Sequence, residues 1–265
     1  ATITRTTYDS AGEAEWPMAG ANPQRTSWTP EEVRGTLNPV WYRVIEPYIA
    51  PSTQIIAANG LLYVSTARGL YVLDAATGAT VWIYPTELPL GNAPTVFNGV
   101  AYVGGYDHKL HALDAITGQA KWTYEAESGF ATNPLVLDVD GCTIVYIGNR
   151  DGCLYAIEDR GSAPALSWKY QTGGSILFSA AYKDGTVYFA SNDSYAYALN
   201  VRDGDLVWKS PKLPGAGFYA WWPVVYENQT TGADAVILAG SDNYRFYLKP
   251  GFGDDLMNRE VVDVF

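Results

Sequence analysis

The sequence predicts an all-β protein, a β-propeller built from four-stranded antiparallel blades. Three observations support this fold class. A unit of about forty residues recurs along the chain, most units end in a tryptophan, and tight-turn dipeptides separate short apolar segments inside the units. Short strands in repeats of this length are typical of propellers. About five blades are detectable.

The first observation is the spacing of the tryptophans. Trp82, Trp122, Trp168 and Trp208 are separated by 40, 46 and 40 residues (82 to 122 to 168 to 208). The first two close segments of one pattern, Leu-Asp-x-x-Thr-Gly-x-x-x-Trp, and the other two close degraded copies. A fifth, weaker copy follows and has no such tryptophan. The repeat therefore sets the blade boundaries.

Each unit contains four expected strands. An apolar strand precedes an Asn-Gly or Asp-Gly pair such as Asn98-Gly99, which favours a tight hairpin. The second strand holds Tyr-Val, the third holds Leu-Tyr-Ala-Leu, and Thr-Gly turns the chain into the tryptophan strand. The expected segments are an extended N-terminal segment, 1–35, and a propeller, 36–265, with blades near 50–85, 90–126, 131–171, 174–210 and 218–249.

Closure of the ring has two interpretations. Trp41 lies 41 residues before Trp82, in a segment expected to form a strand, 39–45, which lacks three preceding strands. If this strand completes the fifth blade, the chain closes a five-bladed ring and hides its edges. Alternatively, the chain is the N-terminal part of a seven- or eight-bladed ring.

Composition excludes several functions. Lys and Arg number 17 against 28 Asp and Glu, a net charge of −11. Nucleic acids and anionic lipids both require basic patches, so neither is an expected partner. No apolar run reaches the eighteen residues of a membrane span.

The two cysteines are expected to be buried and unpaired. Cys142 and Cys153 flank a predicted hairpin whose four-residue turn is 149–152. In that register Gly148 faces Cys153 and Cys142 faces Asp159, which separates the two sulfurs by roughly 20 Å. A disulfide cannot span that distance.

The segments 73–82 and 113–122 resemble the tryptophan-docking repeats of the PQQ-like β-propeller superfamily, where PQQ is pyrroloquinoline quinone. The segment 16–26 also resembles the one that introduces such propellers in bacterial exported proteins. The resemblance covers about residues 16–248 and is specific for fold, not for function. It implies that the indoles pack between blades. The docking residues would be Trp41, Trp82, Trp122, Trp168, Trp208, Asp74, Asp114, Gly78, Gly118 and Gly204.

The sequence gives little support for an enzymatic function. The PQQ dehydrogenases of this superfamily commonly have two adjacent cysteines and a bound calcium, whereas ten residues separate the two cysteines here, and no Cys-x-x-Cys-His haem motif occurs. Asp138-Val139-Asp140-Gly141 is interpreted as a hairpin turn and not a calcium loop. His111 occupies a third-strand position where other units have tyrosine, and no nucleophile accompanies His108. We expect no catalytic or metal site, and neither PQQ nor calcium as a cofactor.

The remaining candidate for a functional site is a protein-binding surface. In propellers, the loops between second and third strands share one face with the inter-blade segments. Exposed Trp beside Arg suits protein recognition. The alternative for the adjacent tryptophans is burial, one in the core and one between blades. The candidate residues are Arg68, Asp107, His108, Arg150, Asp193, Trp221, Trp222 and Arg245.

The resemblance implies a non-catalytic interaction or scaffold propeller, similar to the propeller lipoproteins of the outer-membrane barrel-assembly machinery. Its partners would be other proteins of the bacterial cell envelope, and its location periplasmic, cell-surface or secreted. Two alternatives stay open: a PQQ-dependent oxidoreductase or a degenerate relative of one, and a structural subunit of a larger extracellular assembly or oligomer.

Overall fold

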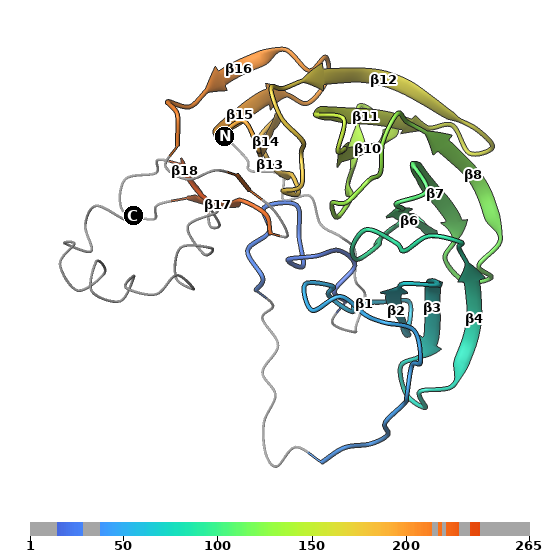
Figure 1. The fold of residues 1–265 in the computed structure, drawn as a ribbon. Coiled ribbons are helices and arrows are strands. Elements are labelled where there is room, and N and C mark those ends of the chain that lie inside the picture. Colours follow the sequence, from blue (N-terminus) through green and yellow to red (C-terminus); the bar gives the residue numbers. More distant parts are fainter. Residues whose placement is uncertain (1–14, 29–37, 214–216, 219–220, 228–233, 239–265) are drawn as a thin grey trace, which may run out of the picture.

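The computed structural model describes residues 15–28, 38–213, 217–218, 221–227 and 234–238. Their strands form four four-stranded antiparallel sheets and one two-stranded sheet, so the all-β prediction is confirmed. Figure 1 shows the sheets side by side along an arc, with the first strand of each near the centre and the fourth at the rim. This is the arrangement of propeller blades.

The strands follow the order expected from the repeat. Blade 1 contains β1 (Ile56–Ala58), β2 (Leu61–Thr66), β3 (Gly69–Asp74) and β4 (Thr80–Pro85). Blade 2 contains β5 (Thr95–Phe97), β6 (Val100–Gly104), β7 (Lys109–Asp114) and β8 (Ala120–Glu125). Blade 3 contains β9 (Leu135–Val139), β10 (Cys142–Gly148), β11 (Cys153–Asp159) and β12 (Pro164–Gln171). Blade 4 contains β13 (Ala181–Lys183), β14 (Thr186–Ser191), β15 (Tyr195–Asn200) and β16 (Leu206–Lys209), and blade 5 is described as β17 (Val224–Glu227) and β18 (Asp234–Ile237).

Tight turns join the first two strands of blades 1 to 4. In blade 2, Asn98 and Gly99 have φ values of 48° and 75°, which are typical of a two-residue hairpin. Asp140 and Gly141, with φ values of 54° and 85°, make the same turn in blade 3. The interpretation of Asp138–Gly141 as a hairpin turn is therefore confirmed, and the Gly141 amide donates to the Asp138 carboxylate over 2.9 Å.

The core lies between blades. We call the side of a blade that meets the next blade along the chain its forward face, and the opposite side its backward face. Tyr63 and Leu70 on the forward face of blade 1 pack with Ala101, Val103 and Leu113 on the backward face of blade 2. The next two interfaces repeat this arrangement. Each blade is thus stabilised by apolar burial against its neighbours.

The N-terminal segment fills the centre of the arc. Trp16 pairs with Ala57 of β1, and the carbonyls of Pro17, Pro23 and Gln24 accept hydrogen bonds from inner strands of blades 2, 4 and 5. The fully buried Arg25 donates to the carbonyls of Ala180 (3.0 Å) and Pro134 (3.1 Å). Residues 16–27 therefore join the innermost strands, an arrangement that the sequence did not indicate.

The arc is open in the described part of the chain. Residues 38–50 run beside blade 1, whereas β17 and β18 lie at the other end of the arc (Figure 1). The prediction of a strand at 39–45 was wrong, because these residues form no strand in the structure and pair with none of the described strands. Closure of a five-bladed ring by this strand is not seen in this structure.

The expectation for the cysteines is partly wrong. Both are free, but Cys142 is exposed and only Cys153 is buried. The predicted register was wrong by one residue, because Thr143 faces Asp159 and Gly148 faces Leu154. The Asn149 amide donates to the Cys153 carbonyl, which shortens the turn to three residues. Cys142 consequently sits beside the Asp140-Gly141 turn.

Candidate interaction surface

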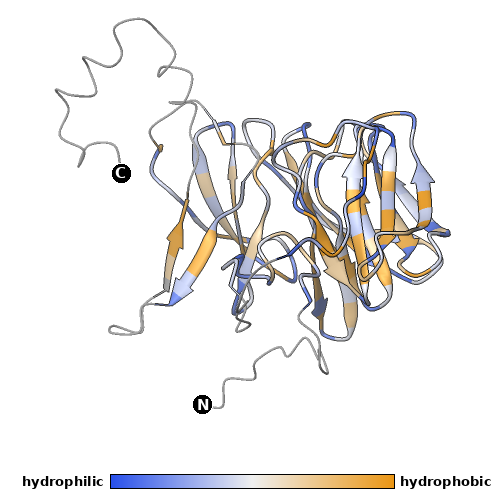
Figure 2. Ribbon diagram, turned by 90° about the horizontal axis from the view of Figure 1, so that it is seen from below, coloured by the Kyte–Doolittle hydropathy of each residue, from blue (hydrophilic) through white to orange (hydrophobic). Residues whose placement is uncertain are grey.

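One side of the arc combines two sets of loops, and we call it the loop face. It contains the turns between second and third strands, around Arg68, His108 and Arg150, and the segments that connect successive blades. The two sets are joined by backbone hydrogen bonds, from Thr86 to Arg68, from Tyr106 to Pro89 and from Arg150 to Gly129. Figure 2 shows apolar bands along the strands, with loops at both of their ends.

A repeated pair braces the turns of the loop face. An aspartate in the turn accepts a hydrogen bond from the side chain four residues later: Asp151 from Tyr155, Asp193 from Tyr197, and Asp107 pairs with His111 Nε2 at 3.0 Å. The same carboxylates accept backbone amides two residues on, for example Cys153 N at 2.8 Å. Each loop is therefore fixed by its own aspartate.

The ionisation of these pairs is set by burial. Desolvation raises the pKa of Tyr155 and of Tyr197, and the adjacent Asp151 and Asp193 carboxylates raise it further. Desolvation lowers the pKa of His111, against the opposing effect of Asp107. A neutral His111 also contacts the Tyr84 hydroxyl through Nδ1 at 3.2 Å. Burial therefore favours the uncharged forms of Tyr155, Tyr197 and His111, and their hydrogen bonds to the aspartates hold the loops in place.

The structure separates the predicted surface residues into groups. Arg68, His108, Arg150 and Trp221 are exposed. Asp107 and Asp193 are the bracing carboxylates, so their hydrogen-bonding capacity is largely used by their own loops and, for Asp193, by Gly173 of the adjacent inter-blade segment. Arg245 lies outside the described residues.

Trp222 does not belong to the exposed surface that the sequence predicted, and this prediction was wrong. It is buried, and its indole lies next to Gly20 of the central segment. Adjacent residues of an extended chain point to opposite sides, so only Trp221 of this pair is exposed. The two rings still meet edge to face, with centroids 6.2 Å apart.

The exposed groups combine cations with aromatic rings. The Arg150 guanidinium lies 5.6 Å from the centre of the Tyr106 ring, which orients it over the loop face. Trp221 adds a large apolar surface. Arginine and tryptophan on rigid loops are the residue types that most often carry binding energy between proteins.

The tryptophans of the outer strands lie between blades. Trp82, Trp168 and Trp41 cover Gly118, Gly204 and Gly78, where an added Cβ would lie within 2.7 Å of an indole atom. The indole nitrogens of Trp41, Trp122 and Trp168 donate to Ala75 O (3.0 Å), Asp159 Oδ1 (2.8 Å) and Val201 O (3.2 Å). Trp208 packs against Tyr188 but remains 37% exposed at the end of blade 4.

The aspartates of the repeat close the turns that carry these glycines. Asp74 and Asp114 accept both the backbone amide and the hydroxyl of the threonine three residues later, at 2.7–2.8 Å. Hydrogen bonds from Thr77 and Thr117 lower the pKa of both carboxyls. The turns thus place Gly118 under the indole of Trp82 in blade 1, and Gly78 under the indole of Trp41 in the segment beside blade 1.

Nowhere in the described part do three His, Cys, Asp or Glu side chains come together as metal ligands. The two cysteines are neither adjacent nor bonded to one another, and the central segment fills the axis. None of the described residues belongs to a helix of the length and apolarity that a membrane crossing requires.

Sequence reasoning missed the braces and the central arginine. The braces do have a signal, an aspartate four residues before a tyrosine or histidine in three successive units (107 and 111, 151 and 155, 193 and 197). Arg25 has no comparable signal, because it occurs once and lies outside the repeat.

The profile of the family described as outer membrane protein assembly factor BamB matches residues 25–165, more than half of the chain. No curated protein matches the sequence. Among solved structures, BamB from Moraxella catarrhalis is 20% identical with a TM-score of 0.55, over 75% of this chain and 68% of that one.

Two quinohemoprotein alcohol dehydrogenases share the fold. The enzyme from Comamonas testosteroni is 16% identical with a TM-score of 0.69, over 84% of this chain and 45% of that one. The Pseudomonas putida HK5 enzyme is 17% identical with a TM-score of 0.65, over 84% and 44%. The chain therefore spans less than half of the length of these enzymes, and the similarity is one of fold.

Proposed function

The chain belongs to the family of the outer membrane protein assembly factor BamB, and on this premise we propose that it is a non-catalytic scaffold that binds other proteins of the bacterial cell envelope. The binding surface is the loop face, with Arg68, Arg150 and Trp221 as its main contacts. Its location in this proposal is extracytoplasmic, in the periplasm or at the outer membrane.

The braced loops are the observation that carries the proposal. Three successive turns are each fixed by an aspartate bonded to a buried tyrosine or histidine of the same blade. A rigid surface loses little conformational entropy when it binds. The fold therefore favours the display of exposed side chains over the enclosure of a substrate.

The charge of the surface suggests what kind of patch it recognises. The chain carries a net charge of −11, yet the exposed loop-face residues include Arg68 and Arg150. A partner patch that combines carboxylates with apolar side chains would complement these arginines and Trp221. The rest of the acidic surface would repel a uniformly acidic partner, which favours one orientation of binding.

A charge reversal on the loop face tests the proposal. The probe is a purified complex that assembles outer-membrane proteins, in detergent, and binding is measured by surface interferometry. We expect Arg150→Glu to weaken binding by about tenfold or more, since it removes a central cation from the patch. The matched control is Lys121→Glu, an exposed reversal on β8 near the opposite end of blade 2.

Two results would contradict the proposal. One is an absence of binding by the unaltered chain, and the other is an equal loss of affinity in both charge reversals. Circular dichroism of both variants ensures that the comparison is made between folded proteins.

A further inference from the structure

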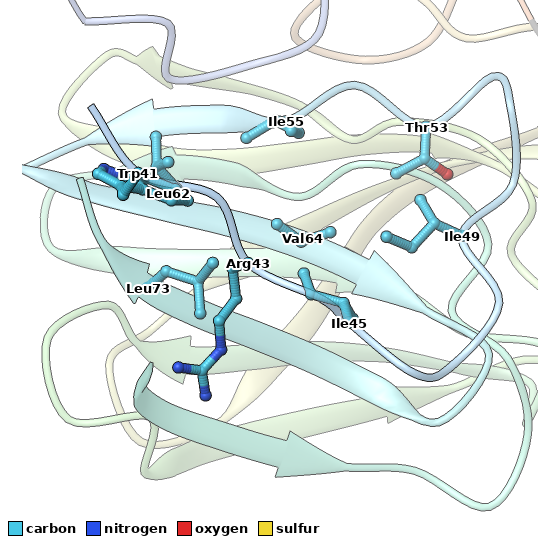
Figure 3. A pocket seen from close by; sticks show the side chains of 9 residues that line it. All are labelled: Trp41, Arg43, Ile45, Ile49, Thr53, Ile55, Leu62, Val64 and Leu73. Carbon is cyan, nitrogen blue, oxygen red and sulfur yellow. The ribbon is translucent and has the colours of Figure 1, made fainter. Parts of the chain in front are cut away.

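The hollow beside blade 1 has the composition of a core. It has a volume of about 450 Å³, and Figure 3 shows it between the sheet of blade 1 and the segment that contains Trp41 and Ile45. Seven of its nine lining side chains are apolar, and none is a thiol, a carboxylate or an imidazole. The reactive groups that the loop face does not use lie instead in exposed turns at the opposite ends of the blades.

The turns between the first and second strands of blades 1 and 2 carry an asparagine followed by a glycine. The pairs are Asn59-Gly60, between β1 and β2, and Asn98-Gly99, between β5 and β6. All four residues are exposed and have φ values between 48° and 75°. Such a pair is chemically labile, because the glycine nitrogen can attack the side-chain carbonyl carbon of the asparagine with no Cβ in the way. Both turns are therefore candidate sites of deamidation.

The attacking nitrogen is accessible in both turns. Among the described residues, no acceptor takes the amide proton of Gly60 or Gly99. Nothing lies within 4 Å of the position that a Cβ would occupy on either glycine. In blade 3, by contrast, the Gly141 amide is held by the Asp138 carboxylate over 2.9 Å. The glycine amides of blades 1 and 2 are thus free to attack.

The two turns differ in one restraint. The Asn59 backbone amide donates to Glu15 Oε1 over 2.8 Å, whereas no described side chain accepts the Asn98 amide. Their other surroundings match, because Gly60 O and Gly99 O each accept an amide from the turn between the third and fourth strands of the same blade, at 3.0 and 2.9 Å. Glu15 is therefore the main structural difference between the two turns.

Glu15 should slow the reaction of Asn59 for two reasons. Ring closure requires the asparagine to rotate out of the turn, which occurs when the hairpin tip opens locally. Opening in blade 1 also breaks the hydrogen bond to Glu15, which costs additional free energy. The carboxylate moreover disfavours the anionic nitrogen that attacks, since both charges are negative. Asn98 lacks both hindrances.

We propose that Asn98 is a site of spontaneous deamidation in the folded protein, and that Glu15 protects Asn59 from the same reaction. The Gly99 nitrogen loses its proton and bonds to Cγ of Asn98, and the side-chain nitrogen leaves with that proton as ammonia. Water then opens the resulting cyclic imide at either of its carbonyls. The products are aspartate, with an unchanged backbone, and isoaspartate, whose backbone runs through the former side chain. Water is the only co-reactant.

The aspartate product fits this turn. Asp184 and Gly185 form the same turn in blade 4, with φ values of 47° and 83°. Deamidation to aspartate therefore adds a negative charge to blade 2 and preserves its hairpin. Isoaspartate instead lengthens the backbone between Phe97 and Val100, which face each other across the hairpin, and is expected to loosen it.

Peptide mapping by mass spectrometry measures the reaction in the full chain, held in mildly alkaline buffer, and chromatography separates the aspartate and isoaspartate products. In the folded chain we expect Asn98 to react about fivefold or more faster than Asn59, since the Glu15 bond must break first. Glu15→Ala should remove most of this difference by accelerating Asn59 alone. Glu15 is exposed, so this variant should fold, and circular dichroism checks that it does.

Asn200 is an internal reference for the measurement. The amide that follows it belongs to the β-branched Val201 and donates to Gly185 O over 2.9 Å, so the attacking nitrogen is occupied and hindered. Asn200 should remain intact while Asn98 reacts. The matched control variant is Asn98→Gly, which accepts the same turn geometry and should remove the product from blade 2.

The same measurement in urea separates structure from sequence. In the unfolded chain Asn59 and Asn98 should react at similar rates, because glycine follows both. A folded chain in which Asn98 stays as intact as Asn200 would overturn the proposed site. A rate difference that persists in urea, or that Glu15→Ala leaves unchanged, would overturn the protective role of Glu15. The turn lies at the end of blade 2 opposite the loop face, so this proposal and partner binding can fail independently.

Discussion

At the scale of the residue, His111 shows how one position of the repeat accepts different chemistry. It stands where blades 3 and 4 carry Tyr155 and Tyr197, as the alignment of the units indicates, and it is bonded to the aspartate four residues before it. Burial disfavours its charged form and lowers its pKa, even though Asp107 favours that form. The residue acts as a neutral packing group.

This environment predicts a pH dependence. The folded pKa of His111 lies below its unfolded value of about 6.5, so the unfolded chain binds the extra proton more readily. The stability from neutral His111 is present above that pH and falls as pH drops below it. We expect His111→Tyr to reduce the loss of stability between about pH 7 and pH 5. Urea unfolding at several pH values measures this, and an unchanged slope would show that His111 contributes nothing to it.

At the scale of the element, the packing of a blade's outer strand depends on the blade that follows it. Trp168 of β12 is 9% exposed between blades 3 and 4, and its indole bonds to Val201. Trp208 occupies the same place in β16 but is 37% exposed. The same residue in the same repeat position therefore has unequal packing.

This difference predicts unequal costs for one substitution. Trp168→Ala should lower the free energy of unfolding by about 3–5 kcal/mol, because it opens a cavity beneath the ring. Trp208→Ala should cost roughly half of that or less, since much of its ring already meets solvent. Denaturant titration of both variants provides the comparison. Equal losses would contradict this expectation and would indicate that Trp208 is covered by other groups in solution.

Much of each blade was predictable because the relevant interactions are local. The Asn-Gly and Asp-Gly turns set hairpins, and the Asp-x-x-Thr-Gly turns place glycine under an indole, within a few residues of sequence. The register at Cys142 was not predictable, because it depended on whether Asn149 bonded across the hairpin. The burial of Trp222 depended on the central segment, more than two hundred residues earlier.

At the scale of the whole molecule, the central segment joins blades that share no strand. Arg25 is the main polar group of this junction. Its guanidinium donates to carbonyls that precede the first strands of blades 3 and 4, namely Pro134 and Ala180, and it also bonds to Ala19 within its own segment. The Pro134 carbonyl also accepts the Thr95 hydroxyl over 2.7 Å, whereas Arg25 is the donor to the buried carbonyls of Ala19 and Ala180.

We therefore expect Arg25→Met to destabilise the whole arc by about 2–5 kcal/mol, because it leaves buried acceptors without a donor. Arg25→Lys keeps the charge but cannot reach carbonyls in several directions, so it should also be destabilising. Thermal unfolding followed by tryptophan fluorescence measures both. A lysine variant as stable as the unaltered chain would show that charge alone, and not the planar fork, satisfies the site.

The position of Arg25 also bears on biosynthesis. Its bond to the Ala180 carbonyl joins residues that are 155 positions apart in the sequence, so this bond can form only after blade 4 has been synthesised. The central segment is therefore synthesised before the blades that it joins, and its contacts with blade 4 form only after that blade has been made. Contacts so distant in sequence slow folding, so the junction at Arg25 is expected to form late in folding.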